Sequence, residues 1–320
     1  MTWLLNRLFD HQHRTDPLFA FQGTVNWMRA LSILVSEGAF SHDPLRIFYG
    51  QIQRRPPNQE ADTLAFKCLL MAIHNVSALQ KTCELDEPYS LVRSAIIAWY
   101  YATYYGSKSM LAAATGSDPE THSKTCKVWQ AEIATRNLAI SPFDLYLKNL
   151  TPKNIENAIN RLRNGNLNNL NVTPTNHEQA FGAAISYLKG TADYERERLE
   201  KKVVQESPIF KAHGFVNFRT IAARVIRDES LIKAHVNFLV EAFRYRGKAN
   251  YRDAIYLSYG ADYSDTLTAF VQDLANVARA FTLMAAHYLS CRVIQVNWRA
   301  FVDDIVANAR FHLPYDLSEI

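Results

Sequence analysis

Apolar residues recur every three or four positions along most of this chain, which is the spacing of one buried face of an α-helix. The longest stripe follows Ser264 and Asp265, two residue types that favour helix N-termini. A second strong pattern covers 89–114, behind an acidic, proline-containing entrance. Weaker helical patterns cover 18–36, 61–80, 125–139, 177–204 and 229–245. No alternating strand pattern stands out, so the chain is predicted to be all-α.

One segment interrupts the helical pattern. Nine asparagines, Pro152, Gly165 and Pro174 lie within 151–177. Asparagine side chains compete with the helix backbone for hydrogen bonds, so 164–176 is predicted to be a surface loop. The following stretch 193–206 carries nine charged residues of both signs in fourteen. This composition predicts an exposed helix end with internal ion pairs, or a short coiled-coil arm.

Composition narrows the class of protein. The 320 residues are 48% hydrophobic and 21% charged, as expected for a globular chain. The four cysteines are widely spaced, no helical His-x-x-x-His pair occurs, and no glycine-rich phosphate loop is present. We therefore expect no metal or cofactor, and no ATPase, GTPase or dehydrogenase. The N-terminus lacks the pattern of a signal peptide and no apolar run is long enough to cross a membrane, so a cytoplasmic protein without membrane contact is predicted.

Positive charge is concentrated in one window. Residues 211–252 contain nine Lys or Arg and three Asp or Glu, a net +6, whereas the whole chain is +4. The segment 244–252, Arg-Tyr-Arg-Gly-Lys-Ala-Asn-Tyr-Arg, is the densest part. A local basic field suits an anionic partner such as RNA or a nucleotide. The alternative is a solvated helix surface whose acidic partners come from elsewhere in the fold.

A row of tyrosines provides a second candidate surface. Tyr101, Tyr104, Tyr105 and Lys108 have the spacing of one helix face. Aromatic rings stack on nucleic-acid bases, and an ammonium group can hold a phosphate. The alternative is that these tyrosines pack at the edge of the core, with their hydroxyls satisfied there.

These residues carry a family resemblance. The run Tyr100-Tyr101-Ala102-x-x-Tyr105-x-x-Lys108-x-x-Leu111 precedes Thr121-His122-Ser-Lys124, and Arg246-x-x-Ala249-Asn250-Tyr251 precedes the long helix. This order resembles small bacterial and archaeal HEPN domains (higher eukaryote and prokaryote nucleotide-binding). The resemblance implies an antiparallel helical bundle from 85–145 and 240–292. The remaining parts are then an N-terminal helical region (1–84), a helical insertion (146–239) and a C-terminal extension (293–320).

Many HEPN proteins are metal-independent ribonucleases in antiphage defence or toxin–antitoxin systems, and their Arg-x(4–6)-His motif supplies an arginine and a histidine. The resemblance therefore suggests Arg246 for the scissile phosphate. The chain departs from the motif, because the next histidine after Arg246 is His287, and Asn250 replaces an aspartate. Asparagine cannot titrate, so it cannot act as a base. His122 is the candidate for acid–base catalysis, although a role as helix cap or turn residue is also open.

The predicted function is thus an HEPN-like protein that binds RNA or a nucleotide, with ribonuclease activity left open and dependent on a partner. The binding residues predicted beside Arg246 and His122 are Arg244, Lys248, Asn250, Tyr251, Arg252, Tyr101, Tyr105 and Lys108. The order of motifs also predicts that Tyr101 or Tyr105 lies near the segment that begins at Arg246. A protein partner is expected, either a second copy or another defence-system subunit. The alternative function is a catalytically inactive helical scaffold subunit of a larger complex.

Overall fold

The computed structural model describes every residue except 1–2, 5–6, 8–16, 248–254, 256 and 260–261. Over the described residues the chain is predominantly helical, which confirms the predicted all-α class. The strands in this part of the chain are a single antiparallel pair, β1 (Tyr146–Lys148) and β2 (His235–Asn237). Strands of three residues are too short to produce a recognisable alternation in the sequence.

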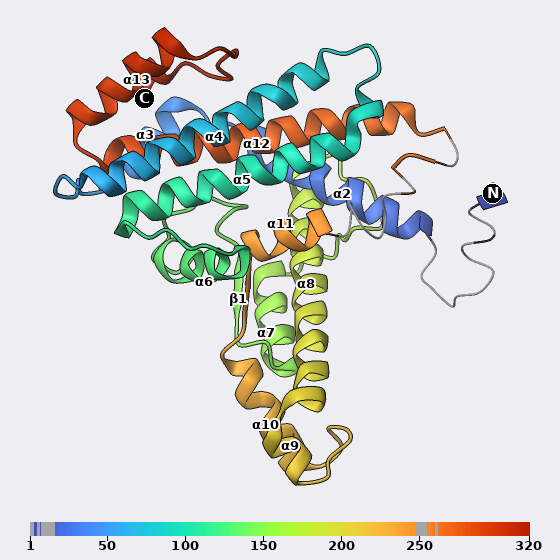
Figure 1. Ribbon diagram of the computed structural model, residues 1–320. Helices are drawn as coiled ribbons and strands as arrows, with labels where there is room; N and C mark the ends of the chain where they lie inside the picture. The colour runs from blue at the N-terminus through green and yellow to red at the C-terminus, as the bar shows by residue number, and fades with distance from the viewer. Residues whose placement is uncertain (1–2, 5–6, 8–16, 248–254, 256, 260–261) are drawn as a thin grey trace.

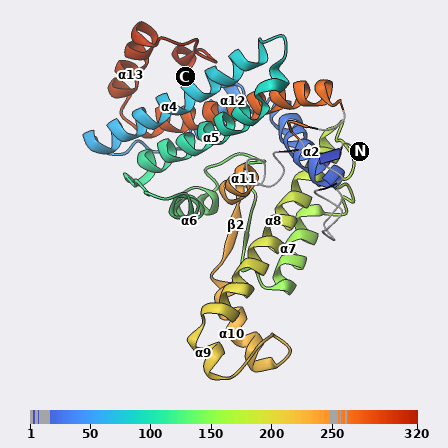
Figure 2. The ribbon, with the colours of Figure 1, turned by 45° about the vertical axis from the view of Figure 1, so that its right-hand side comes forward.

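The molecule has a broad head and a narrow stalk, as Figures 1 and 2 show. Three long helices pack together in the head, namely α4 (Gln59–Cys83), α5 (Val92–Thr115) and α12 (Ser264–Arg292), and α2 (Pro17–Ser36) packs against α12. Helix α4 comes from the region 1–84 and packs along both α5 and α12. Shorter helices complete the head: α3 (His42–Tyr49), η1 (Pro88–Leu91), α6 (His122–Glu132), η2 (Ala134–Arg136), α11 (Phe238–Gly247), α13 (Gln295–Asn308) and η4 (Leu317–Glu319).

Helix α12 confirms the strongest sequence pattern. Its apolar stripe is buried throughout, with Phe270, Leu274 and Phe281 at 0% exposure. The helix begins at Ser264, whose backbone N–H donates to the Asp262 carboxylate at 3.0 Å. Gly106 of α5 lets α12 approach closely, because a Cβ at this position would lie 3.1 Å from the Phe281 ring. The head core therefore depends on large rings packed against small residues.

The stalk is formed by α7 (Pro152–Arg163), α8 (His177–Glu206), α9 (Pro208–Ala212), α10 (Ile221–Ile232) and the strand pair. The first half of α8 packs on α2, and the second half projects away from the head. Ion pairs line this second half, where Asp193 bonds both Lys189 and Arg196 and Glu195 bonds Arg198. The charged run 193–206 is therefore a helix end with internal ion pairs.

The segment predicted as one helix, 229–245, is divided in the structure. It contains the end of α10, then β2, then most of α11. The asparagine-rich segment 164–176 connects α7 to α8 without a helix or strand. It is tied to α2, because the Asn26 side chain donates to the Leu170 carbonyl at 2.8 Å and the Gln22 side chain donates to the Asn171 carbonyl at 2.9 Å.

Candidate functional site

Helix α11 runs between the head and the stalk and points consecutive side chains in different directions. Tyr245 is buried in the head, where its hydroxyl donates to the Thr24 carbonyl at 2.8 Å. This anchor fixes the rotation of the helix and turns Arg246 toward α5 and α6. The Arg246 guanidinium carbon lies 4.7 Å from the centre of the Tyr100 ring and 5.3 Å from that of Phe243. The cation thus rests on two aromatic rings.

His122 reaches the same rings from the start of α6. The N-cap of this helix is Thr121, whose hydroxyl accepts a hydrogen bond from the Lys124 backbone at 3.2 Å, so capping does not occupy the His122 side chain. Its Nδ1 atom lies 2.6 Å from the Tyr100 hydroxyl. The imidazole stacks on Phe243, with ring centres 5.3 Å apart and planes at 22°. Arg246 and His122, far apart in the sequence, therefore share Tyr100 and Phe243 as neighbours.

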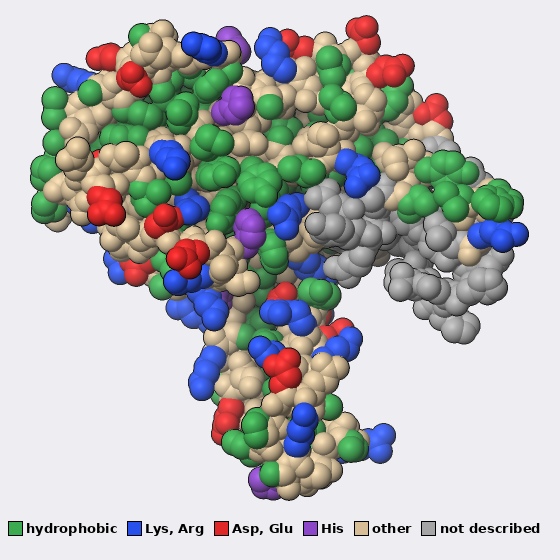
Figure 3. Space-filling model, viewed as in Figure 1, with side chains coloured by type: hydrophobic (Ala, Val, Ile, Leu, Met, Phe, Trp, Pro, Cys, Tyr) green, Lys and Arg blue, Asp and Glu red, His purple; other side chains and the backbone are tan. Residues whose placement is uncertain are grey.

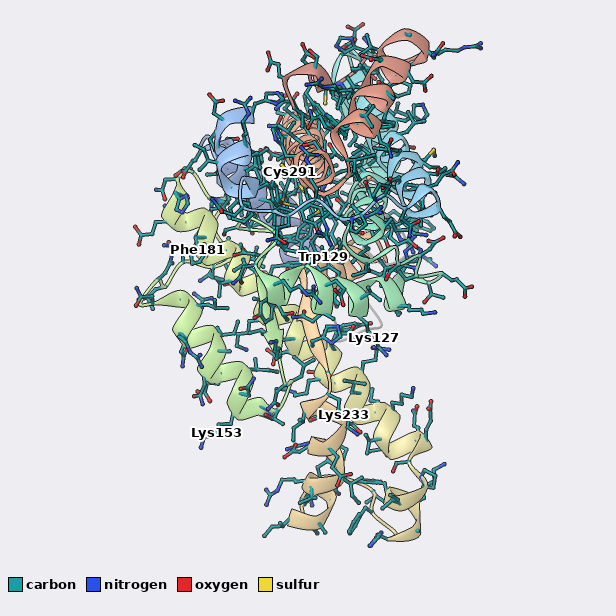
Figure 4. The ribbon with its side chains drawn as sticks, turned by 90° about the vertical axis from the view of Figure 1, so that its left-hand side faces the viewer. Lys127, Trp129, Lys153, Phe181, Lys233 and Cys291 are labelled. Atoms are coloured by element: carbon teal, nitrogen blue, oxygen red, sulfur yellow. The ribbon has the colours of Figure 1, made fainter. Side chains whose placement is uncertain are left out.

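Helix α6 is held in position by its inward face. Trp129 is fully buried and packs on Phe281 with ring centres 5.7 Å apart. Figure 4 shows Trp129 on the side of α6 that faces the head, whereas Lys127 projects away from it. The helix is thereby fixed against the core, and the start of α6 presents His122 at the junction with α11.

The surroundings of His122 favour its neutral form. Burial first, and then the positive charges of Arg246 and Lys108, lower the pKa of His122. Burial raises the pKa of Tyr100, although the Arg246 charge acts in the opposite direction. Because the phenol keeps its proton, it can donate to Nδ1 of His122, and the neutral ring then carries its own proton on Nε2. In that state the Nδ1 lone pair, which would otherwise accept a proton, accepts the hydrogen bond from Tyr100.

The tyrosine face of α5 is partly covered. Tyr100 is buried, whereas Tyr101, Tyr104 and Tyr105 are half-buried and contact one another, with the Tyr101 and Tyr105 ring centres 5.9 Å apart. Arg246 meets Tyr100 directly, and Tyr101 lies one ring further away, its centre 5.5 Å from that of Tyr100. One part of this face is therefore packed in the core, as the core interpretation predicts, and another part stays accessible, as the binding interpretation requires.

Lys108 is engaged within the protein. Its ammonium group forms an ion pair with Asp118 and lies 5.9 Å from the centre of the Tyr104 ring. Burial lowers its pKa but the Asp118 carboxylate raises it, and the net direction is upward. Lys108 thus stays charged, and its field reaches His122 without adding an unpaired cation to the site.

Arg244 lies on another side of α11. Its guanidinium donates to the Thr191 hydroxyl at 2.9 Å and lies 4.9 Å from the centre of the Tyr194 ring. Glu241 is buried nearby, and burial raises its pKa well above the usual range, although Arg244 acts in the opposite direction. Arg244 thus belongs to the contact between α11 and α8, and it does not join Arg246 in a single basic surface.

The remaining predicted binding residues, Lys248, Asn250, Tyr251 and Arg252, lie outside the described residues. The rest of the basic window is divided between distant parts of the molecule. Lys211, Arg224 and Lys233 belong to the stalk, whereas Arg246 lies beside the head. Figure 3 accordingly shows Lys and Arg side chains scattered over the stalk and the head. A charge sum over neighbouring positions cannot detect such a division.

Sequence reasoning missed Phe243, which contacts both Arg246 and His122. It lies three residues before Arg246 on the same helix, so the signal was present in the helical spacing. The enclosed space at this cluster is small. A cavity of about 10 Å³ is lined by Tyr100, Thr103, Tyr104, His122, Thr125, Cys126 and Leu239. Such a volume holds roughly one water molecule, so a ligand would have to bind on the outer side of the rings.

A larger pocket lies on another face of the head, between α2, α12 and the asparagine-rich segment. Its volume is about 580 Å³, and its walls include Phe21, Tyr263 and Phe270. The charged groups in it are Arg29 and the buried Asp273, which pair with each other at 3.0 Å. Because these charges neutralise each other, the pocket attracts an anionic ligand less strongly than the Arg246 cluster does.

Comparison of the chain with protein-family models, with curated proteins and with solved structures finds no significant match. Among the described residues, no group of three or more His, Cys, Asp or Glu side chains has an arrangement suited to a metal ion. Within that same part of the chain, no helix combines the length and apolar character needed to cross a bilayer.

Proposed function

We propose that the protein is HEPN-like and binds the phosphate of RNA or of a nucleotide at Arg246, beside His122. The observation that carries this proposal is the meeting of Arg246 and His122 on Tyr100 and Phe243. In the resembling family, one short motif supplies the arginine and the histidine. Here α11 would supply the arginine and α6 the histidine, so the pair would form by folding.

The chemistry of the two side chains supports this assignment. A guanidinium keeps its charge at every relevant pH and can grip two phosphate oxygens. The Nε atom of Arg246 is buried and has no hydrogen-bond partner among the described residues. A buried donor without a partner is costly, so an incoming acceptor would gain from it. The half-buried Tyr101, Tyr104 and Tyr105 extend from Tyr100 along α5 and offer rings on which unpaired bases could stack.

The proposal extends to ribonuclease activity. The lowered pKa of His122 keeps the imidazole neutral near pH 7, the form that accepts a proton. His122 would take the 2′-OH proton while the 2′ oxygen attacks phosphorus, and the 5′ oxygen would leave and take its proton from solvent. This step requires the Tyr100 hydroxyl to release Nδ1, or the ring to exchange its tautomer. We therefore propose slow or partner-dependent cleavage, in a defence or toxin–antitoxin setting in the cytoplasm.

RNA binding can be tested by fluorescence polarisation with a fluorescein-labelled single-stranded RNA. Arg246→Ala is expected to weaken binding roughly tenfold and to lower the slope of log affinity against log salt by about 0.7, because one phosphate contact is lost. Arg246→Lys should recover only part of the affinity, since an ammonium cannot reproduce the two-pronged contact. His122→Ala should bind RNA like the wild type and abolish any cleavage. Equal RNA affinity and salt slope in wild type and Arg246→Ala would refute the proposal.

A scaffold role is the second candidate, and the enclosure of the cluster favours it. The Nδ1 atom of His122 is engaged by Tyr100, Lys108 is engaged by Asp118, and the space between the rings holds roughly one water molecule. On this hypothesis the aromatic cluster fixes α6 and α11 against α5. Arg246→Ala would then lower the melting temperature and leave RNA binding unchanged, a combination opposite to the one expected above.

A further inference from the structure

Helix α10 of the stalk has two apolar faces, of which the stalk uses one. Ala223 and Leu231 are fully buried against the rest of the stalk. On the outer face, Ile221 is 74% exposed, Val225 is 53% exposed and Ile232 is 56% exposed. A single exposed aliphatic residue needs no explanation, but a line of three on one helix face marks a contact surface. Figure 3 shows apolar and basic side chains together at the tip of this stalk.

The outer face has the spacing of a coiled-coil seam. Ile221, Val225, Asp228 and Ile232 are separated by four, three and four positions, which places all four along one side of the helix. Asp228 is half-buried and bonds the neighbouring Arg227 at 2.8 Å. Arg224 is exposed beside this seam, and no ion pair is formed by it among the described residues. The surface is thus an aliphatic line that includes Asp228, with Arg224 on one flank and Glu229 on the other.

We propose that this outer face of α10 pairs with the same face of a second copy of the chain, with the two helices antiparallel. In this arrangement Ile221 lies opposite Ile232 of the second copy, and Val225 lies opposite Asp228 of the second copy. A twofold axis between the helices makes every contact occur twice. Ile221 and Ile232 at the ends of the seam then cover each other, and the contact between Val225 and Asp228 occurs twice at its centre.

The charges on this face favour the antiparallel orientation, and they favour a second copy of the chain as the partner. In a parallel pair, Asp228 would face Asp228 of the second copy in the middle of the seam, which is repulsive. In the antiparallel pair, Asp228 lies beside Arg224 of the second copy, because Arg224 lies one turn before Asp228 on the same flank of the helix. Two symmetric ion pairs follow, and each uses an arginine that is unpaired within the described part of the chain.

The contact is small, since α10 spans three turns and offers four layers of side chains. It falls below the roughly 800 Å² per partner of a standard interface, so a dissociation constant on the order of 10–100 μM is expected. The stalk tip is remote from α11, the helix that carries Arg246 (Figure 1), so this pairing is independent of the proposed RNA binding.

Sedimentation velocity of the full chain at concentrations from about 5 to 200 μM tests the pairing across the dissociation constant expected for so small an interface. The wild type should change reversibly from monomer to dimer. Val225→Asp should remain monomeric, because it faces Asp228 of the second copy with a like charge, whereas Val306→Asp, which alters a valine of similar exposure on α13, should dimerise like the wild type. A wild type that stays monomeric throughout, or a dimer unaffected by Val225→Asp, would overturn the proposal.

A charge exchange tests the register. Arg224→Asp and Asp228→Arg should each be monomeric, because each places like charges together across the twofold axis. Mixed in equal amounts, they should form a heterodimer, since Asp228 of one variant then pairs with Arg224 of the other, and the two introduced side chains pair with each other. The melting temperature of each variant checks its fold, because Asp228→Arg removes the ion pair with Arg227 and leaves Arg227 its pair with Glu200. If Asp228→Arg lowers the melting temperature, Val225→Asp and its control decide alone. A mixture of folded variants that stays monomeric would refute this antiparallel register.

Discussion

Helices α12 and α10 are both amphipathic, but they use their apolar residues differently. Helix α12 is covered on most sides by α4, α5 and α2, and its large side chains are fully buried. Helix α10 buries Ala223 and Leu231 and leaves three large aliphatic residues exposed. An apolar helix pattern therefore predicts burial, but it does not show whether the same chain supplies the covering surface. Helix α12 is covered by other helices of the same chain, whereas the outer face of α10 is not.

The largest contrast between head and stalk is expected in the cost of deleting an apolar side chain. Phe281 is fully buried and packs on Trp129, Phe143 and Phe238. Phe281→Ala should lower the free energy of unfolding by about 3–5 kcal/mol, because it removes buried surface and leaves a cavity.

The matched stalk variant is Ile221→Ala, which should change the free energy of unfolding by less than about 0.5 kcal/mol. Urea unfolding followed by circular dichroism at low protein concentration, where the proposed stalk pairing is absent, measures both values. A cost for Ile221→Ala close to that for Phe281→Ala would show that the stalk tip is covered within the monomer.

The next contrast concerns acid sensitivity. His287 of α12 is buried beside His42, and burial, then the charges of His42 and Arg46, lower its pKa from 6.5 to about 3. Between these two pH values the unfolded chain binds a proton at His287 that the folded chain does not. Stability from this group is therefore complete above pH 6.5 and falls by about 1.4 kcal/mol per pH unit below it.

His287→Gln should accordingly lose about 2–3 kcal/mol less than the wild type when the pH is lowered from 6.5 to about 4.5. The stalk control is His213→Gln, because His213 is exposed near α9. This control should follow the wild-type pH profile of urea midpoints. Identical profiles for His287→Gln and the wild type would contradict the assigned burial of an uncharged imidazole.

The smallest contrast is between two helical glycines. A Cβ on Gly106 would lie 3.1 Å from the Phe281 ring, whereas a Cβ on Gly190 of α8 would have no atom within 4 Å. Gly106→Ala should cost about 1–2 kcal/mol, since overpacking outweighs the better helix propensity of alanine. Gly190→Ala should stabilise the protein by up to about 1 kcal/mol. Thermal unfolding should therefore shift in opposite directions, and shifts of the same sign would mean that the α5–α12 contact can relax.

The long helices were predictable because their apolar residues follow one period on one face, as Leu267, Phe270 and Leu274 do in α12. The strand pair was not, because Tyr146–Lys148 pairs with His235–Asn237, from which the helices of the stalk separate it in the sequence. The candidate site was predictable in part. Arg246 and His122 were identified by residue type and motif, but their meeting on Phe243 depends on how α11 is rotated by Tyr245. Spacing along the sequence carries no record of that rotation.

The separation of Arg244 from Arg246 has the same origin. Two positions apart on a helix, side chains point to opposite sides, so a basic segment in the sequence need not be a basic surface. Arg244 contacts Tyr194 and Thr191 of the stalk, whereas Arg246 contacts Tyr100 of the head. Helix α11, which carries both arginines, therefore joins the head to the stalk.

In the proposed function, an RNA phosphate binds at Arg246 and brings its negative charge close to His122. An NMR titration of the His122 ring against pH, with and without saturating single-stranded RNA, tests it most directly. Without RNA, the pKa of His122 should lie below 6.5, because of burial and the Arg246 charge. With RNA, the bound phosphate should offset that charge and raise the pKa of His122, and Arg246→Ala should remove this rise. A His122 pKa that is unchanged when RNA binds would contradict the account.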